Sequence, residues 1–220
     1  MRNLNQFPDD KIEREVLSRG KTVCGIDEVG RGAWAGPLVL AAVVPGDGMI
    51  DGVRDSKKIS PKKRESLAKE IHSWATSIGF GVVSNSEIDE MGLSRAITLG
   101  SKRALIQVEQ SGISIDEVLL DGNYDFLKDS KKTVRTYIKG DNLSHLIAAA
   151  SIVAKVYRDN MMASEAVAGK YPEFMFESNK GYPSPVHKTA LSQLGATPIH
   201  RVSWNIFQDS FPKSGQQALI

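Results

Sequence analysis

The chain has 220 residues, of which 41% are hydrophobic, and its 28 basic and 26 acidic side chains leave a formal net charge of +2. This length and apolar content are enough for one sizeable core, so we expect a single domain over residues 1–220. A charge so close to neutral excludes binding to nucleic acid through overall basicity, which leaves only local basic clusters for such a role.

The first 20 residues are polar and lack the apolar segment of a signal peptide, and a short helix is expected over residues 10–17. No apolar run approaches the roughly 20 residues needed to cross a bilayer, so we expect no membrane contact. The last ten or so residues are expected to be mobile.

Residues 23–32 read Val-Cys-Gly-Ile-Asp-Glu-Val-Gly-Arg-Gly. They predict a buried strand over about residues 22–27 that ends on two neighbouring acids, Asp27 and Glu28. Adjacent carboxylates repel each other and are costly to desolvate, so their position indicates a bound cation such as Mg²⁺ or Mn²⁺. A solvent-exposed acidic turn is the alternative, and the two acids alone do not distinguish it.

Cysteine and histidine usage excludes other metal sites. Cys24 is the only cysteine, so the chain can form neither an internal disulfide nor a cysteine zinc site, which is typical of the reducing cytoplasm. The histidines show no ligand spacing, which argues against a histidine zinc site. They are His72, His145, His187 and His200.

A connection rich in glycine and proline follows, and the apolar residues 38–45 predict a second strand antiparallel to the first. Gly30, Gly32 and Gly36 also suggest a dinucleotide-binding loop. That alternative requires a helix directly after the glycines, whose N-terminus receives the pyrophosphate. Proline and an apolar, β-branched-rich run follow instead, so the sequence argues against a nucleotide cofactor.

Basic residues gather in residues 54–64, which read Arg-Asp-Ser-Lys-Lys-Ile-Ser-Pro-Lys-Lys-Arg. Ser60 is a good N-cap and Pro61 a good first helical residue, so a helix is expected to begin there. Its first turn then carries three cations, which the helix dipole disfavours. A bound polyanion would relieve that conflict, although a solvated basic turn explains the pattern equally well.

Further strands and helices alternate along the chain. Residues 78–83 predict a third strand, and apolar residues over 93–108 recur at the spacing of a long helix. Residues 117–121 predict a fourth strand that again ends in an acid followed by glycine, and residues 133–138 predict a fifth. A last helix is expected through residues 191–194.

An alanine-rich helix is expected after Asn142, and it reaches Asp159 near its far end. Ile152, Val156 and Asp159 lie on one face of that helix, so Asp159 can reach the edge of the surface that packs on the sheet. The alternative is an ion pair with Lys155, worth only about 0.2 to 0.5 kcal/mol.

Three acids therefore lie at strand ends and a fourth lies on a core-packed helix. In an open α/β sheet, active groups gather beside the strand ends, so these side chains can meet. Such a set is typical of two-metal phosphoryl transfer, in which the ions activate a water and stabilise the leaving oxygen. The acids are Asp27, Glu28, Asp121 and Asp159.

These segments together resemble the type 2 ribonucleases H, and among them the bacterial ribonucleases HII. The matching blocks occur in the family's order and cover a core of about residues 21–205, with short extensions at both ends. A lone Asp-Glu pair would not be specific, whereas the blocks together are. They are residues 25–32, 35–37, 55–58, 120–122, 147–159, 180–182 and 200–201.

The resemblance implies an α/β ribonuclease H-like fold, with a five-stranded mixed sheet flanked by helices and a helical C-terminal portion. It implies an endoribonuclease that cleaves the RNA strand of RNA/DNA hybrids and nicks 5′ of single ribonucleotides in duplex DNA, leaving 3′-hydroxyl and 5′-phosphate ends. By the same match, the carboxylates of Asp27, Glu28, Asp121 and Asp159 bind Mn²⁺ or Mg²⁺, with two ions expected.

The resemblance also implies how the substrate is read. Gly30, Arg31 and Gly32 resemble the turn that contacts the ribose 2′-hydroxyl and the adjacent phosphate, and Tyr182 resembles the tyrosine that stacks on the next deoxyribose. The chemistry agrees, because only the 2′-hydroxyl marks a ribonucleotide within DNA and glycine permits close approach of the backbone. A flat ring packs against a deoxyribose but would meet the hydroxyl of a ribose.

Lysines supply the remaining expected contacts, because they bind phosphates and position a duplex without reading its sequence. They are Lys57, Lys58, Lys62 and Lys63. The expected partners are hybrid and ribonucleotide-containing duplexes and a replication-associated protein, and a monomer is expected. The alternatives are a binding module that has lost catalysis and a type 3 ribonuclease H, which would spare single ribonucleotides.

Three residues depart from the family's motifs, namely Trp34, His145 and Ser184. None of them is a proposed ligand. They bear on the shape of the substrate groove rather than on the chemistry.

Overall fold

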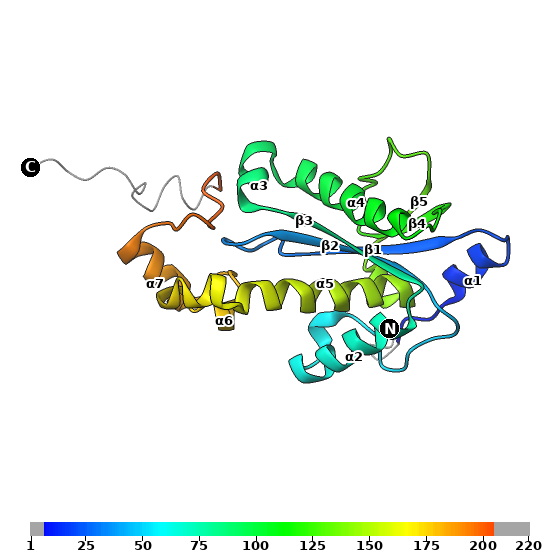
Figure 1. The fold of residues 1–220 in the computed structure, drawn as a ribbon, viewed down its shortest axis with the longest axis horizontal. Coiled ribbons are helices and arrows are strands. Elements are labelled where there is room, and N and C mark those ends of the chain that lie inside the picture. Colours follow the sequence, from blue (N-terminus) through cyan, green and yellow to red (C-terminus); the bar gives the residue numbers. More distant parts are fainter. Residues whose placement is uncertain (1–6, 205–220) are drawn as a thin grey trace, which may run out of the picture. The chain divides into compact units, whose positions relative to one another are not determined.

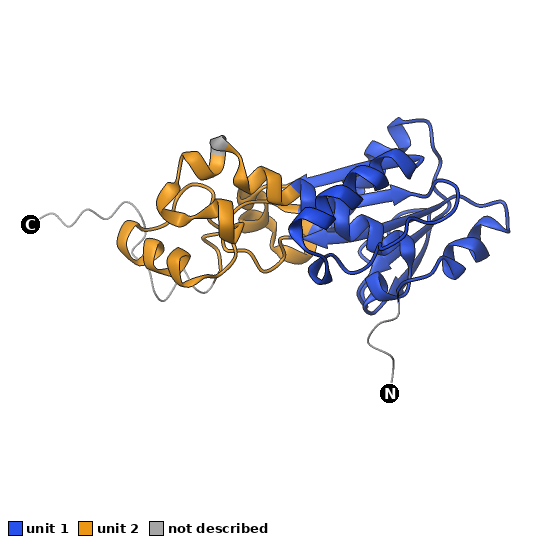
Figure 2. Ribbon diagram, turned by 90° about the horizontal axis from the view of Figure 1, so that it is seen from below, with its two compact units in different colours: residues 1–29, 39–82, 97–157 blue, residues 30–38, 83–96, 158–220 orange. Residues whose placement is uncertain are grey.

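In the computed structural model, residues 7–204 are described, apart from the side chains of residues 165 and 166. The chain forms two compact units, shown in blue and orange in Figure 2. The first comprises residues 1–29, 39–82 and 97–157, and the second comprises residues 30–38, 83–96 and 158–220. A single domain therefore stays a prediction, and the C-terminal residues expected to be mobile lie outside the described ones.

The first unit is built around a five-stranded sheet with the order β3-β2-β1-β4-β5 (Figure 1). Its strands are β1 (Val23–Val29), β2 (Leu38–Val44), β3 (Ser77–Val83), β4 (Glu117–Asp121) and β5 (Thr133–Tyr137). Strand β1 is antiparallel to β2 and parallel to β4, and β4 is parallel to β5. The five strands and the antiparallel start that the sequence predicted are confirmed.

Helices cover both faces of this sheet (Figure 1). Helix α4 (Leu93–Gln110) lies on one face, and α2 (Pro61–Trp74) and α5 (His145–Ala163) lie on the other. Glycines in the strands permit the helices to pack closely on the sheet. A Cβ at Gly81 would meet the Gly100 carbonyl of α4, and a Cβ at Gly25 would lie 2.8 Å from the Leu146 backbone of α5. No helix among the described residues has the length and apolarity for crossing a bilayer.

The central strands form the core of the first unit. Every residue of β2 is buried, and so is every residue of β1 except Glu28. Such continuous burial explains why both strands read as apolar runs rather than as alternating patterns. Cys24 is fully buried in β1, and burial raises the pKa of its thiol to about 12, so this cysteine is packed and unreactive.

Helix α1 (Lys11–Leu17) contributes an acid that fixes the start of α5. The Glu13 carboxylate accepts hydrogen bonds from the Ser144 hydroxyl at 2.6 Å and from the Leu146 N–H at 2.8 Å. An acceptor at this place satisfies helix N–H groups that lack partners, and its charge suits the positive end of the helix dipole. Burial raises the pKa of Glu13.

The second unit packs short helices around a small apolar core. The helices are α3 (Asn85–Met91), α6 (Phe176–Asn179) and α7 (Pro185–Leu194), with helical turns at Glu165–Gly169 and Pro172–Phe174. The buried core residues are Ala35, Met162, Phe174, Phe176, Ala190 and Leu191. The sequence predicted only part of α7 here, because the other helices are too short to show a clear apolar period.

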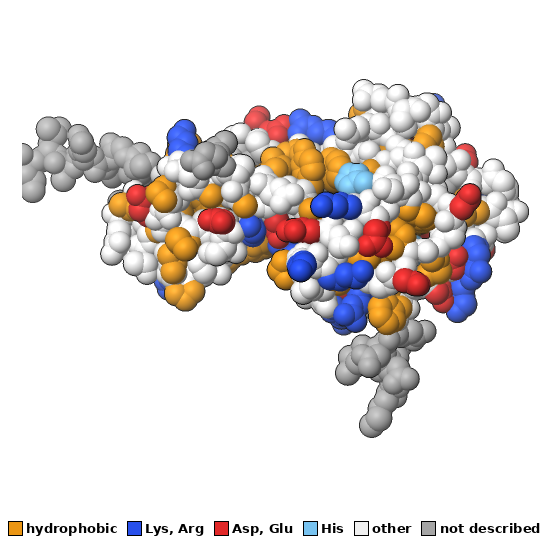
Figure 3. Space-filling model, turned by 60° about the horizontal axis from the view of Figure 1, so that its bottom comes forward, with side chains coloured by type: hydrophobic (Ala, Val, Ile, Leu, Met, Phe, Trp, Pro, Cys, Tyr) orange, Lys and Arg blue, Asp and Glu red, His pale blue; other side chains and the backbone are white. Residues whose placement is uncertain are grey.

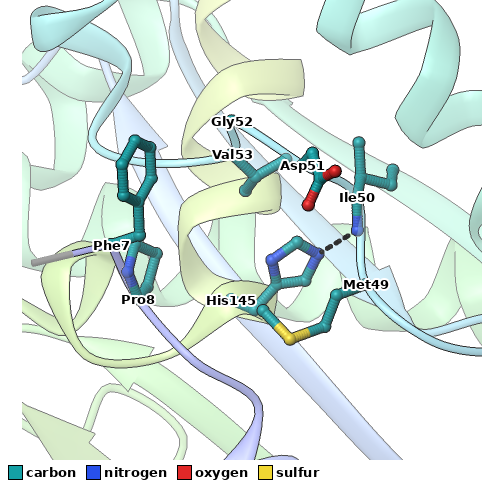
Figure 4. Close-up of a pocket in the computed structure, with 8 residues that line it drawn as sticks. All are labelled: Phe7, Pro8, Met49, Ile50, Asp51, Gly52, Val53 and His145. Atoms are coloured by element: carbon teal, nitrogen blue, oxygen red, sulfur yellow. Dashed lines mark hydrogen bonds between the residues drawn. The ribbon is translucent and has the colours of Figure 1, made fainter.

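A cavity of about 390 Å³ lies beside the start of α5 (Figure 4). His145 lines it and accepts a hydrogen bond at Nε2 from the Ile50 N–H at 3.2 Å. The other lining residues are Phe7, Pro8, Met49, Asp51, Gly52 and Val53. None of the residues predicted to bind metal or substrate lines this cavity, so it is not the predicted site.

Candidate active site

Three of the four predicted ligand acids come together at one end of the sheet in the first unit. Asp27 and Glu28 belong to the last three residues of β1, and Asp121 ends β4. The register pairs Ile26 with Leu120, so Asp27 and Asp121 occupy the next position on each of two parallel strands. Parallel pairing thus brings carboxylates from distant parts of the chain to the same sheet edge.

Asp27 is the most perturbed member of this group. It is only 8% exposed, and its pKa lies well above the usual range because burial disfavours the charged form and because Glu28 and Asp121 add negative charge. A hydrogen bond from the Ser151 side chain and one from the Glu28 N–H at 2.8 Å act in the opposite direction. Carboxylates with mutually unfavourable charges thus lie close together here, a setting that is typical of a cation site.

A further acid lies next to Asp121 and was missed by the sequence analysis. The Gly140 N–H donates a hydrogen bond to Asp121 Oδ1 at 2.6 Å. Gly140 is also the first residue of the helical turn Gly140–Asn142, which contains Asp141. The pKa of Asp141 is raised by burial and then by the charges of Asp55 and Asp121. The signal in the sequence was the Gly-Asp pair just after the fifth strand.

Lys57 and Lys58 lie beside these acids, in the helical turn Ser56–Lys58. The Asp55 carboxylate accepts from the Lys57 N–H at 2.9 Å and so fixes the start of this turn. The Lys57 charge lowers the pKa of Asp141, and Lys58 Nζ donates to Asn142 Oδ1 at 2.5 Å. Both predicted phosphate-binding lysines therefore lie next to the turn that carries the additional acid.

The basic residues in the first turn of α2 have two different roles. Lys62 and Lys63 are exposed, and Figure 3 shows basic side chains, with acidic ones among them, on the face that carries α2. Arg64 instead donates to the carbonyls of Ser56 and Ile59, both at 2.9 Å. Arg64 thus braces the turn that presents Lys57 and Lys58, while Lys62 and Lys63 stay available to a polyanion.

A pair of serines connects that turn to the acids. The hydroxyl oxygens of Ser56 and Ser151 are buried and lie 3.0 Å apart, and Ser151 also bonds to Asp27. Both serines lie in blocks that resemble the family, residues 55–58 and 147–159, but the sequence indicated no role for either. Nothing local in the sequence marks them, because their partners lie far away along the chain.

The donor chemistry of this cluster fits a hard divalent cation, since every acidic member offers carboxylate oxygens. One oxygen of Asp27 and one of Asp121 accept backbone N–H groups, and both carboxylates keep further lone pairs that could bind a cation. Among residues 7–204, no three acidic, histidine or cysteine side chains are already spaced as ligands of one ion. Asp159 lies in α5 within the second unit and is partly buried.

The glycine-rich loop after β1 belongs to the second unit and meets Tyr182. Gly30 and Gly36 have φ values of +94° and +83°, which favour glycine. The Gly30 N–H donates to the Tyr182 phenol oxygen at 3.1 Å. Arg31 and Gly32 are exposed. The loop leads into β2 rather than into a helix, which excludes the dinucleotide-binding alternative.

A buried arginine, for which the sequence indicated no role, holds this loop. Arg158 is fully buried and donates to the carbonyls of Pro37 at 2.8 Å, Lys180 at 2.9 Å and Ala35 at 3.1 Å. Its guanidinium carbon lies 5.1 Å from the centre of the Tyr182 ring. Arg158 therefore joins the glycine-rich loop to the segment that presents Tyr182.

A second buried arginine acts on the same loop. Arg201 donates twice to the Gly36 carbonyl, at 3.0 and 3.1 Å, and once to the Arg31 carbonyl at 3.3 Å. Burial, followed by the nearby Arg158 charge, lowers the pKa of Arg201 to about 9. Because these guanidinium groups bind several carbonyls each, they fix the backbone that carries the predicted reader of the 2′-hydroxyl.

Two of the residues that depart from the family's motifs have structural roles in the second unit. Ser184 is the N-cap of α7, and its hydroxyl accepts from the His187 N–H at 3.1 Å. Trp34 packs edge-on against the His187 ring, with centroids 5.3 Å apart.

Comparison with known proteins identifies the family. A family model described as Ribonuclease HII matches residues 24–207. The chain belongs to the ribonuclease HII family. A ribonuclease HII of Streptomyces avermitilis is 44% identical over 209 residues, which cover 94% of this chain and 87% of that protein. A ribonuclease HII of Sulfurihydrogenibium sp. is 40% identical over 201 residues, covering 90% and 97%.

Solved structures share the fold. The ribonuclease H2 from Pyrococcus horikoshii OT3 matches with a TM-score of 0.69 and 29% identity, covering 85% of this chain and 95% of that one. The RNase HII of Archaeoglobus fulgidus, solved as a complex with PCNA, matches with a TM-score of 0.67 and 28% identity, covering 83% and 95%. The predicted ribonuclease H-like fold is confirmed, and the protein is an endoribonuclease with ribonuclease H activity on RNA/DNA hybrids.

Proposed function

We propose that this ribonuclease HII also nicks duplex DNA on the 5′ side of a single embedded ribonucleotide, leaving 3′-hydroxyl and 5′-phosphate ends. The observation that carries the proposal is the hydrogen bond between the Gly30 N–H and the Tyr182 phenol oxygen. This hydrogen bond connects the glycine loop with the Tyr182 ring. The backbone of the loop can approach a 2′-hydroxyl, and the flat ring can pack against the deoxyribose that follows. The proposal is therefore recognition of the junction from RNA to DNA.

Divalent cations complete the proposed site. We assign the carboxylates of Asp27, Glu28, Asp121 and Asp159 as the groups that hold Mn²⁺ or Mg²⁺, with two ions in the active state. Such ions supply an activated water and stabilise charge on the leaving oxygen. The raised pKa of Asp27 supports this assignment, because a cation would relieve the repulsion from Glu28 and Asp121.

The remaining residues bind and orient the duplex. Exposed Gly32 leaves the backbone open to the sugar, and the Arg31 guanidinium can bind the neighbouring phosphate through two donors. Lys57 and Lys58 contact phosphates close to the acids, where their charge offsets the repulsion between substrate and carboxylates. These contacts position the backbone and leave the choice of the cut to the 2′-hydroxyl.

A replication-associated protein is the partner that we propose for this chain. The support is the Archaeoglobus fulgidus relative, which was solved in complex with PCNA. A monomeric state and a cytoplasmic location stay predictions from the sequence.

Cleavage mapping tests the proposed function. End-labelled duplexes that are all DNA, a continuous RNA/DNA hybrid, or DNA with one ribonucleotide are incubated with Mg²⁺, Mn²⁺ or EDTA. We expect cutting of the hybrid and one nick 5′ of the ribonucleotide, both lost in EDTA. Cutting of the hybrid alone would indicate type 3 behaviour, and metal-independent binding without any cut would indicate a binding module; either result contradicts the proposal.

A further inference from the structure

The second unit contains a buried pair of histidines that the proposed function leaves unused. Nε2 of His187 and Nε2 of His200 lie 2.9 Å apart, and the two residues are 0% and 1% exposed. Phe174 and Phe176 pack against both rings, with centroid distances between 5.0 and 5.9 Å. In such apolar surroundings every ring nitrogen needs a matched partner.

The partner of His187 at one end fixes the position of its proton. His187 Nδ1 lies 3.0 Å from the backbone carbonyl oxygen of Tyr182. A carbonyl oxygen can only accept, so Nδ1 carries the hydrogen. The neutral His187 ring then has Nε2 free to accept a hydrogen bond.

The partner of His200 at the other end gives the complementary result. His200 Nδ1 lies 2.9 Å from the backbone nitrogen of Thr197, and the Thr197 hydroxyl oxygen lies 2.8 Å from the same ring atom. A backbone N–H can only donate, so Nδ1 of His200 is unprotonated. The hydrogen of the neutral His200 ring is therefore on Nε2, which points at His187.

Both ends thus require the same arrangement, in which one hydrogen lies between the rings. Thr197 donates to His200, His200 donates to His187, and His187 donates to the Tyr182 carbonyl. A proton added to His187 would set two N–H groups against each other, and one added to His200 would oppose the Thr197 N–H. The relay is therefore complete only when both rings are neutral.

This relay ends on the residue that the proposed function assigns to the deoxyribose. Tyr182 is held at its phenol by Gly30, whose N–H lies 3.1 Å away, and at its backbone by His187. We propose that His187 and His200 are positioning residues that fix the Tyr182 backbone and thereby set the preference of the enzyme for the RNA–DNA junction. This inference rests on the proposed function of Tyr182.

Two substitutions at His187 separate positioning from packing. His187→Asn keeps an N–H₂ group at the position of Nδ1, where it can donate to the Tyr182 carbonyl. In His187→Gln the amide lies at the position of Nε2. The glutamine amide can therefore face His200, but the Tyr182 carbonyl is left without a donor. Both variants lose the same ring and the same aromatic contacts, so loss of packing affects them alike.

The readout is the ratio of kcat/KM for the duplex with one ribonucleotide to kcat/KM for a continuous hybrid. We expect His187→Gln to lower this ratio roughly tenfold, in line with the loss of one buried hydrogen bond, and His187→Asn to stay within about twofold of the parent. His72→Gln, at an exposed histidine of α2, is the control. Equal ratios for the Asn and Gln variants would overturn the proposal.

The tautomers are measured on the parent protein by histidine ¹⁵N spectra at pH 7, whatever the stability of the variants. We expect a hydrogen on Nδ1 of His187 and on Nε2 of His200. A charged ring or the opposite tautomer would overturn the relay. A parent protein that cuts neither substrate would instead contradict the proposed function, and the spectra would still decide whether the relay exists.

Discussion

The Gly30 N–H donates to the phenol oxygen of Tyr182 at 3.1 Å, although 152 positions separate the two residues along the chain. This hydrogen bond joins the loop that follows β1 to the segment that precedes α7. Arg158 reinforces the connection through carbonyls on both segments. A loop held in this way can present its backbone to a substrate without first having to be ordered.

Substitutions at Tyr182 separate its ring from its hydroxyl. Tyr182→Phe removes one hydrogen bond and keeps the ring, so we expect kcat/KM on the single-ribonucleotide duplex to fall by no more than about tenfold. Tyr182→Ala also removes the stacking surface, and we expect a loss of about 100-fold or more. Steady-state rates on that duplex measure both. Equal losses for the two variants would show that the ring does not contact the sugar.

Gly32→Ala tests how closely the substrate approaches the loop. A Cβ at Gly32 would meet nothing within 4 Å, so we expect the free energy of unfolding to change by no more than about 0.5 kcal/mol. Cleavage at a single ribonucleotide should nevertheless fall at least tenfold, because the methyl group would occupy the space of the sugar. Urea unfolding and cleavage rates are measured on the same preparation. Parent-like cleavage would place the substrate backbone elsewhere.

Arg158→Lys tests the brace behind the loop. A lysine cannot reach three carbonyls in different directions, so buried acceptors are left without donors. We expect the free energy of unfolding to fall by about 3 kcal/mol in urea titrations. Arg95→Lys, at an exposed position, is the control and should change stability little. Equal stability of the two variants would show that the carbonyl contacts contribute nothing.

Acid should destabilise the protein through His200. Burial, followed by the repulsion that a protonated His187 would add, lowers the pKa of His200 from 6.5 to about 4. Between these values the unfolded chain binds a proton that the folded one does not, so stability falls as pH drops from 6.5 to 4, by a contribution of the order of 3 kcal/mol. His200→Gln should flatten this dependence in urea titrations at pH 7 and 4.5. An unchanged slope would contradict the shift.

The strands and long helices were predictable because each leaves a local pattern. Strands β1 and β2 are buried along almost their whole length and read as apolar runs, while Ser60 and Pro61 mark the start of α2. Helix α3 was not predicted. Ser84 and Glu87 form a capping box at its start, but a serine followed three residues later by a glutamate also occurs by chance, so this pattern alone does not indicate a helix.

The site was predictable where a residue's type already limits its role. Neighbouring acids at a strand end are costly, so Asp27 and Glu28 pointed to a cation. Arg158 would ordinarily be taken for a surface cation, and its burial depends on carbonyls far away in the sequence. The contact between His187 and His200 likewise follows from the tertiary fold, since neither its spacing nor its neighbours indicate it.

We propose that carboxylates distant along the chain hold the same divalent ions. Mn²⁺ binding, followed by the EPR signal of the free ion, tests it on the parent and on Asp27→Asn, Asp121→Asn and Asp159→Asn, with exposed Glu65→Gln as the control. We predict at least tenfold weaker Mn²⁺ binding for each aspartate variant and parent-like binding for the control. Without metal, Asp27→Asn should be at least as stable as the parent, because the substitution removes the repulsion of Asp27 by Glu28 and Asp121. Parent-like Mn²⁺ binding by Asp121→Asn or Asp159→Asn would show that the substituted acid is not a ligand of the ions.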